Sequence, residues 1–177
     1  MSNILYPDEY LESAYQINFR QLYHKGYRGV IFDIDNTLVP HGAPADARSI
    51  TLISDLKKMG YQVVLMSNNR KERVKSFQKN MRVPYIWKAG KPNPKNYRRS
   101  MRIMKTNHKN TLFVGDQIFT DISGANLAKI RTILVKPINP QEEIQIVLKR
   151  YLERIVLLFY KRRLRKRTLH GSRKELG

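Results

Sequence analysis

The sequence contains no cysteine in 177 residues, so disulfide bridges and thiolate metal sites are both excluded. The N-terminus, Met1 to Asp8, lacks the basic region and apolar stretch of a secretory signal. The longest apolar run, Ile155 to Tyr160, is far shorter than the roughly 20 residues that a membrane-spanning helix requires. We therefore expect a cytoplasmic protein, with any membrane contact peripheral and at the inner face of the membrane.

Acidic residues are also scarce, since 14 Asp and Glu stand against 34 Lys and Arg and give a formal charge of +20. Such an excess attracts polyanions, namely nucleic acid, anionic lipid or phosphorylated ligands, and does not choose among them. Part of the excess lies between Lys161 and Arg167, where it belongs to a basic tail.

The rest of the chain fits one domain with one apolar core, given its length and its 41% of hydrophobic residues. Short apolar runs alternate with segments of helical periodicity, a pattern typical of βαβ units. We predict an α/β protein with a three-layer, Rossmann-like fold around a mainly parallel sheet of about five strands. The expected strands span residues 29–32, 62–66, 85–87, 111–114 and 131–135. The expected helices span residues 46–59, 70–79, 94–105 and 118–128, with Gly60 as a C-terminal cap and Pro94 in a first turn.

Polar residues follow three of the expected strands. Asp33 follows residues 29–32, Ser67 follows residues 62–66, and Asp116 comes just after residues 111–114. Right-handed crossovers carry the carboxyl ends of parallel strands to one edge of the sheet, where open α/β sheets bind ligands. We therefore expect these polar residues to converge.

Four aspartates lie at or just after the expected strand ends of this otherwise basic chain: Asp33, Asp35, Asp116 and Asp121. Clustered carboxylates raise one another's pKa unless a cation compensates, and Mg²⁺ prefers oxygen ligands. An Asp-x-Asp pair alone is weak evidence, because loops and helix caps are rich in aspartate. The second acidic pair, after another apolar strand, makes a divalent metal site the better interpretation.

With these motifs in order, residues 29–135 resemble the haloacid dehalogenase (HAD) superfamily of phosphohydrolases. The Asp-x-Asp-x-Thr motif of that superfamily corresponds to Asp33 to Thr37, and its Ser or Thr after the next strand corresponds to Ser67. Its lysine corresponds to Lys91, and its final acidic pair to Asp116 and Asp121.

The resemblance implies roles for these residues. Asp33 would be the nucleophile that forms an aspartyl-phosphate, and Asp35 the general acid and then base. Mg²⁺ would be held by Asp33, the backbone carbonyl of Asp35 and Asp116, with support from Asp121. Phosphate would be bound by Ser67, Lys91 and, ranked second, Asn68. Two plainer interpretations stay open: Ser67 caps the helix that begins near residue 70, and Asn68 is an ordinary turn residue.

The spacing between the motifs leaves room for no cap domain. In the superfamily, members without a cap act on exposed phosphates of large or membrane-bound substrates. The segments Leu5 to Tyr10, Lys25 to Gly29 and Asp33 to Pro40 look like the bacterial YqeG family, of HAD subfamily IIIA. That family is similar to mitochondrial phosphatidylglycerophosphate phosphatases, which implies phosphatidylglycerophosphate as the substrate.

Three regions are expected along the chain: an N-terminal extension over residues 1–28 that packs on the domain, the capless phosphatase domain with a terminal helix over 29–160, and a flexible basic tail over 161–177. Near the end of the domain, apolar residues fall on one helical face: Ile144, Val147, Leu148, Tyr151, Leu152, Ile155 and Leu158 or Phe159. Such a helix can lie on an anionic bilayer or pack on the sheet, and the two can coexist.

Other functions remain open at this stage. The phosphatase could act on a nucleotide, a nucleic-acid end, a sugar phosphate or a phosphoprotein. The charge alone suggests a non-catalytic nucleic-acid-binding protein, although such a protein has no need of Asp35. The histidines have no metal-ligand spacing and receive no role: His24, His41, His108 and His170.

Overall fold

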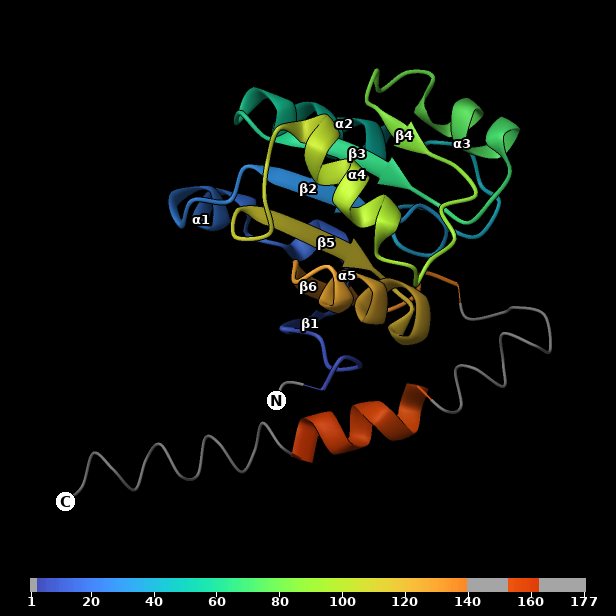
Figure 1. Ribbon diagram of the computed structural model, residues 1–177. Helices are drawn as coiled ribbons and strands as arrows, with labels where there is room; N and C mark the ends of the chain where they lie inside the picture. Colours follow the sequence, from blue (N-terminus) through green and yellow to red (C-terminus); the bar gives the residue numbers. More distant parts are fainter. Residues whose placement is uncertain (1–2, 140–152, 163–177) are drawn as a thin grey trace.

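The computed structural model describes residues 3–139 and 153–162. A six-stranded sheet forms its centre, with the strands in the order β1-β6-β5-β2-β3-β4 and every neighbouring pair parallel (Figure 1). The strands are β1 (Glu9–Leu11), β2 (Gly29–Phe32), β3 (Gln62–Met66), β4 (Tyr85–Ile86), β5 (Thr111–Gly115) and β6 (Arg131–Val135). The predicted α/β fold is confirmed, and the five expected strands are present.

The sixth strand, β1, comes from the segment that the sequence suggested was an extension. It pairs with β6 at the edge of the sheet, with Tyr10 opposite Leu134. Asp8 fixes the register, because its Oδ2 accepts hydrogen bonds from both the backbone nitrogen and Oγ1 of Thr132, at 2.8 and 3.1 Å. After β1, a 3₁₀ turn (η1, Ala14–Gln16) and helix α1 (Phe19–His24) complete this segment.

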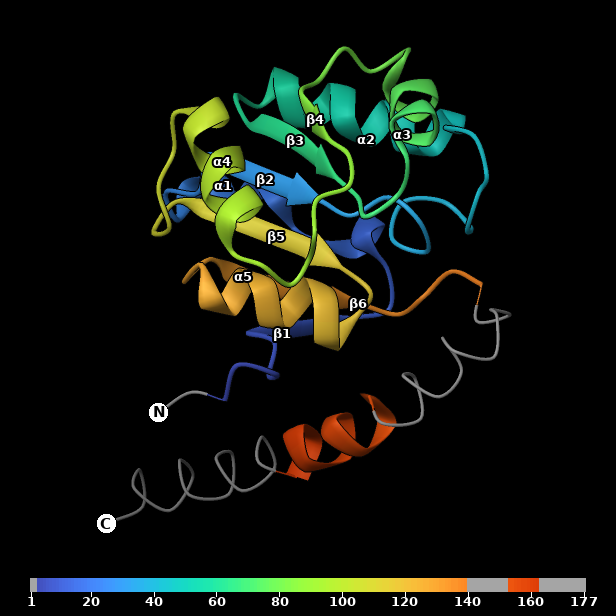
Figure 2. The same cartoon turned by 45° about the vertical axis from the view of Figure 1, so that its right-hand side comes forward.

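The helices cover both faces of the sheet, as Figures 1 and 2 show. Alternate strand residues point to opposite faces, so Phe32 and Ile31 belong to different clusters. The face that holds Phe32 packs against α1, α2 (Ala47–Lys58) and α3 (Lys71–Gln78). The other face packs against α4 (Lys95–Met104) and α5 (Ser123–Leu127). The result is the three-layer arrangement expected from the sequence.

Local signals in the sequence set the helix ends. Asp46 caps α2 and forms a capping box with Ser49. Gly60 follows the last turn of α2 with φ of 96°, the left-handed conformation that glycine adopts easily. Pro94 immediately precedes α4.

The helix expected over residues 118–128 is divided. Its first turn, η2 (Ile118–Ile122), is a π-helix, and α5 follows it. The carbonyl of Gln117 accepts hydrogen bonds from Asp121 and Ile122, at 2.9 and 3.2 Å, so the first turn is wider than an α-helical one. Periodicity did not reveal this turn, because π and α turns bury similar residues.

The connections after β2 and β3 contain loops and single helices, and the described residues include no cap domain. Residues 153–162 form a helix that lies beside β1 and η2 (Figures 1 and 2). The more N-terminal members of the predicted apolar face, Ile144 to Leu152, lie outside the described residues, as does most of the basic tail. Among the described helices, none is both long and apolar enough to cross a bilayer.

Candidate phosphatase site

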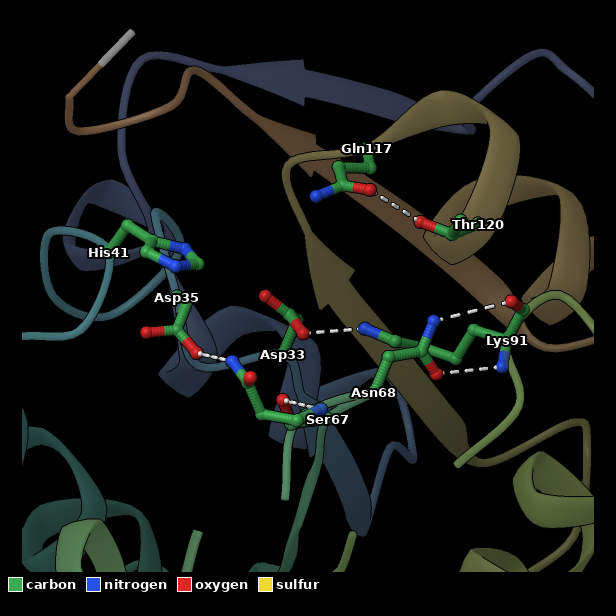
Figure 3. Close-up of a pocket in the computed structure, with 9 residues that line it drawn as sticks. Asp33, Asp35, His41, Ser67, Asn68, Lys91, Gln117 and Thr120 are labelled. Atoms are coloured by element: carbon green, nitrogen blue, oxygen red, sulfur yellow. Dashed lines mark hydrogen bonds and ion pairs between the residues drawn. The ribbon is translucent and has the colours of Figure 1, made fainter. Parts of the chain in front are cut away.

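A pocket of about 190 Å³ opens at the carboxyl edge of the sheet (Figure 3). It lies where β2 and β5 are neighbours, which is the point at which the chain switches from one side of the sheet to the other. Sites for drug-sized ligands occupy about 300–1,000 Å³, so this pocket suits a phosphoryl group and its nearest atoms. Its lining consists of Asp33, Asp35, His41, Ser67, Asn68, Asn69, Lys91, Gln117 and Thr120.

Asp33 is buried directly after β2, and its backbone nitrogen donates to the carbonyl of Val114 at 2.9 Å, which ties it to β5. Asn36 takes a left-handed conformation with φ of 63° and turns the chain back. Thr37 is thereby placed beneath the carboxylates, with its Oγ1 3.4 Å from Asp33 Oδ2 and 3.3 Å from Asp116 Oδ1. The first motif therefore folds so that its threonine joins two strand ends.

Lys91 reaches into the same place from the loop after β4. Its Nζ lies 2.5 Å from Asp33 Oδ1 and 2.6 Å from Asp121 Oδ1, and all three side chains are buried. Figure 3 shows Lys91 and Asp33 pointing toward each other across the pocket. The two carboxylates hold the pKa of Lys91 above its usual range in spite of burial, so the ammonium stays charged.

Asp33, Asp116 and Asp121 form a buried acidic cluster, in which one oxygen of each lies within 4.8 Å of the others. Burial, with a further contribution from the charge of Asp121, raises the pKa of Asp33 to about 7, although the charge of Lys91 acts in the opposite direction. The cluster thus sets three carboxylates against the one ammonium of Lys91. Three carboxylates at this separation fit a hard divalent cation.

The carboxylate of Asp35 turns away from the acidic cluster. It accepts hydrogen bonds at 2.8 Å from the backbone nitrogen of Gly42, from Nδ2 of Asn69 and from Nη2 of Arg73. Burial alone would raise the pKa of Asp35, but the Arg73 hydrogen bond, followed by those of Gly42 and Asn69, holds it below its usual range. Two aspartates two positions apart therefore have opposite environments.

The structure separates the two polar residues that follow β3. The hydroxyl of Ser67 is buried and accepts a hydrogen bond from Asn69 N at 3.1 Å, while helix α3 begins after Arg70 without a side-chain cap. Ser67 lines the pocket, as a phosphate-binding residue must, and its role in phosphate binding remains a prediction. Asn68 Oδ1 accepts from Lys91 N at 2.9 Å and its Nδ2 donates to Lys91 O at 3.3 Å. Asn68 thus positions the backbone of Lys91, and its contact with phosphate also remains a prediction.

The π turn seats Asp121. Its Oδ2 accepts from the backbone nitrogen of Gln117 at 3.1 Å, and a Cβ on Gly115 would come within 2.5 Å of that same oxygen. Only glycine fits at the end of β5 without displacing the carboxylate. The hydroxyl of Tyr97 donates to the carbonyl of Thr120 at 2.8 Å and anchors the turn to α4.

Glu153 supports this loop from outside the pocket. It is buried, and its Oε1 accepts a hydrogen bond from the backbone nitrogen of Ile118 at 2.9 Å. Ile118 is the first residue of η2 and lies two positions after Asp116. The C-terminal helix therefore holds in place the start of the segment from Asp116 to Asp121, the acidic loop.

Sequence reasoning missed several of these residues. Arg73 is one of 34 basic residues, and Glu153 is far from every motif along the chain, so neither gave a signal. His41 received no role, yet it lines the pocket together with Gln117 and Thr120. For Gln117, its position directly after Asp116 in the sequence is a signal that could have indicated a place in the site.

Comparison with known proteins places the chain in a family. Residues 88–137 match the family model described as HAD-hydrolase-like. A Bacillus subtilis (strain 168) protein named "Probable phosphatase YqeG" is 35% identical over 158 residues, which cover 89% of this chain and 92% of that protein. The chain belongs to the YqeG family of HAD-superfamily phosphatases.

Solved structures agree with this family at the level of the fold. The cobalt-bound deoxy-D-mannose-octulosonate 8-phosphate phosphatase of Haemophilus influenzae has a TM-score of 0.51 and 14% identity, over 62% of this chain and 68% of that one. A Bacteroides fragilis structure described as a haloacid dehalogenase-like hydrolase has a TM-score of 0.53 and 15% identity, over 68% and 93% of the two chains. The YqeG-family chain thus has the HAD fold.

The contact between Arg73 and Asp35 makes a prediction about pH. A carboxylate whose pKa is lowered by folding contributes stability above its unfolded pKa, and this is lost as pH falls through the folded pKa. Arg73→Met should therefore lower the free energy of unfolding by on the order of 2 kcal/mol at pH 7. The difference from the wild type should narrow in acid, as measured by denaturant unfolding at several pH values.

The control for this experiment is Lys75→Met, which removes an exposed cation from the same helix. Its effect should be small at every pH. A loss of stability by Arg73→Met that stays constant down to the acid limit would show that the residue acts by packing rather than through Asp35.

Glu153 allows a second prediction. In Glu153→Ala the Ile118 amide loses its acceptor, the acidic loop loosens, and kcat toward an aryl phosphate should fall by about tenfold. Glu153→Gln keeps an acceptor oxygen and should recover most of the activity, whereas Arg154→Ala, at the exposed neighbouring position, should leave it unchanged. Equal activity of Glu153→Ala and the wild type would remove the supporting role.

Proposed function

We propose that this chain is a magnesium-dependent phosphomonoesterase that forms an aspartyl-phosphate on Asp33. The observation that carries the proposal is the position of Asp33, which is buried at the end of β2 beside Lys91 and in one cluster with the carboxylates of Asp116 and Asp121. A carboxylate fixed beside an ammonium and an acidic cluster, in a pocket of phosphoryl size, is suited to attack phosphorus.

In the first step, an oxygen of the Asp33 carboxylate attacks phosphorus and the bond from phosphorus to the ester oxygen breaks. Asp35 gives a proton to the departing oxygen. Lys91 and Ser67, which line the same pocket, contact the phosphoryl oxygens and stabilise the charge that spreads over them in the transition state.

In the second step, Asp35 accepts a proton from a water molecule whose oxygen attacks the phosphorus of the aspartyl-phosphate. The bond between phosphorus and Asp33 breaks, which releases inorganic phosphate and restores the carboxylate. The three donors around Asp35 stabilise its ionised form, which is the form that accepts this proton.

Asp33, Asp116 and Asp121, together with the backbone carbonyl of Asp35, would hold Mg²⁺. Its charge, when bound, stabilises negative charge on the phosphoryl oxygens. The raised pKa of Asp33 supports this assignment, because a nearby cation would favour the ionised nucleophile.

We further propose a large or membrane-bound substrate, such as phosphatidylglycerophosphate, with the protein cytoplasmic and in peripheral contact with an anionic membrane. Three observations support this class. The pocket holds little more than a phosphoryl group, the described residues include no cap domain over it, and the chain carries a formal charge of +20. The rest of the substrate, an attached lipid included, would then lie outside the pocket.

The mechanism predicts that Asp33→Asn lowers Mg²⁺-dependent hydrolysis of an aryl phosphate by about three orders of magnitude or more, since the amide is a poor nucleophile. Asp55→Asn, at a half-exposed position on α2, is the matched control and should keep full activity. Removal of divalent cations by a chelator should abolish turnover, and added Mg²⁺ should restore it. Undiminished turnover by Asp33→Asn would refute the mechanism.

The substrate proposal is tested by a panel of phosphate esters. Phosphatidylglycerophosphate in vesicles should be hydrolysed with kcat/KM at least about tenfold above 5′-phosphorylated oligonucleotides, nucleotides, small sugar phosphates and phosphopeptides, because its phosphate is exposed on an anionic surface. If vesicle substrate is untouched while another class turns over, the lipid substrate is wrong. Tight, salt-sensitive binding of RNA or DNA without turnover of any ester would favour the nucleic-acid-binding alternative.

A further inference from the structure

The helix over residues 153–162 has two apolar faces, and only one of them packs on the part of the chain that the structure describes. On the inner face, Val156 and Leu157 pack against Ile118, Ile122 and Leu134. Tyr160 is buried, with its ring 5.6 Å from that of Tyr6. These contacts, with the Glu153 hydrogen bond, explain why the helix docks on the domain.

The outer face is also apolar, and the fold gives no reason for it. Ile155, Leu158 and Phe159 are 40%, 62% and 56% exposed, and their spacing puts them side by side on a helix. Among the described residues, these are three of the eight large apolar side chains that are exposed. Such a gathering on so short a segment is typical of a surface that contacts a partner.

Within residues 153–162, the exposed charges are all basic. Arg154, Lys161 and Arg162 are exposed, whereas the acid of the segment, Glu153, is buried against the domain. Long basic side chains can extend their charged ends to lipid headgroups while apolar neighbours enter the acyl boundary. The outer face therefore combines apolar residues and cations without an exposed acid.

We propose that the outer face of residues 153–162 docks on an anionic lipid bilayer. Charge favours this occupant over a second copy of the chain, because a symmetric dimer would bring basic residues against each other. Nucleic acid would pair with the cations but would leave Ile155, Leu158 and Phe159 in water. A bilayer satisfies both parts of the surface.

The proposal deepens the proposed function and rests on it for the substrate, while membrane binding can be measured without catalysis. The same helix carries Glu153, which holds Ile118 at the start of the acidic loop. Docking of the outer face would thus hold the N-terminal end of this helix, and the Ile118 amide that it contacts, close to the bilayer.

The experiment uses the full chain and vesicle flotation. Wild-type protein should bind vesicles that contain phosphatidylglycerol and bind phosphatidylcholine vesicles much less. The triple variant Ile155→Ser, Leu158→Ser, Phe159→Ser should bind the anionic vesicles at least about tenfold more weakly, since three apolar side chains no longer enter the bilayer. The control, Ile103→Ser with Leu127→Ser, removes apolar side chains of similar exposure elsewhere and should bind like the wild type.

Two enzyme assays separate this proposal from the proposed function. The triple variant should hydrolyse a soluble aryl phosphate like the wild type and lose turnover of vesicle-borne phosphatidylglycerophosphate. Wild-type binding to vesicles without lipid turnover would support the surface and count against the lipid substrate. The surface is wrong if wild-type protein ignores anionic vesicles, if the triple variant binds them equally well, or if light scattering shows a wild-type dimer that the variant loses.

Discussion

The ion pairs of Lys91 with Asp33 and Asp121 are the interaction on which the rest of the site depends. Three charged groups are buried together. Burial of any one of them without its partners would cost on the order of several kcal/mol, as is usual for an unpaired charge in a protein interior. The arrangement therefore persists only if each side chain is held from behind. Asn68 holds the backbone of Lys91, Val114 holds that of Asp33, and the Gln117 amide holds the carboxylate of Asp121.

These supports extend outward to the whole fold. The seat of Asp121 needs Gly115 at the end of β5, because any side chain there would occupy the space of the carboxylate. It also needs the wide turn of η2, which Tyr97 anchors from α4 and Glu153 from the C-terminal helix. A site made from strand ends thus depends on two helices that contribute no side chain to the pocket lining.

The sequence predicted the parts of this structure that are locally determined. Buried parallel strands read as continuous apolar runs, so β2 and β5 were found, and the aspartates after them followed from the topology. The edge strand β1 was missed because its three residues carry no apolar run and its register depends on contacts between Asp8 and Thr132, distant in sequence. Arg73 was missed for a similar reason, since only the folded chain singles it out from the other cations.

In the protein alone, the pKa values of Asp33 and Asp35 are shifted in the directions opposite to those that their proposed roles require. A nucleophile needs an ionised carboxylate, yet burial raises the pKa of Asp33. A general acid needs a proton, yet the hydrogen bonds from Arg73, Gly42 and Asn69 lower the pKa of Asp35. A cation in the acidic cluster would lower the first pKa, and the negative charge of a phosphate ester in the pocket would raise the second. Each ligand would therefore shift the pKa of one of the two carboxyl groups in the direction that its proposed role requires. With both ligands bound, the two carboxyl groups would hold the protonation states that the proposed first step requires.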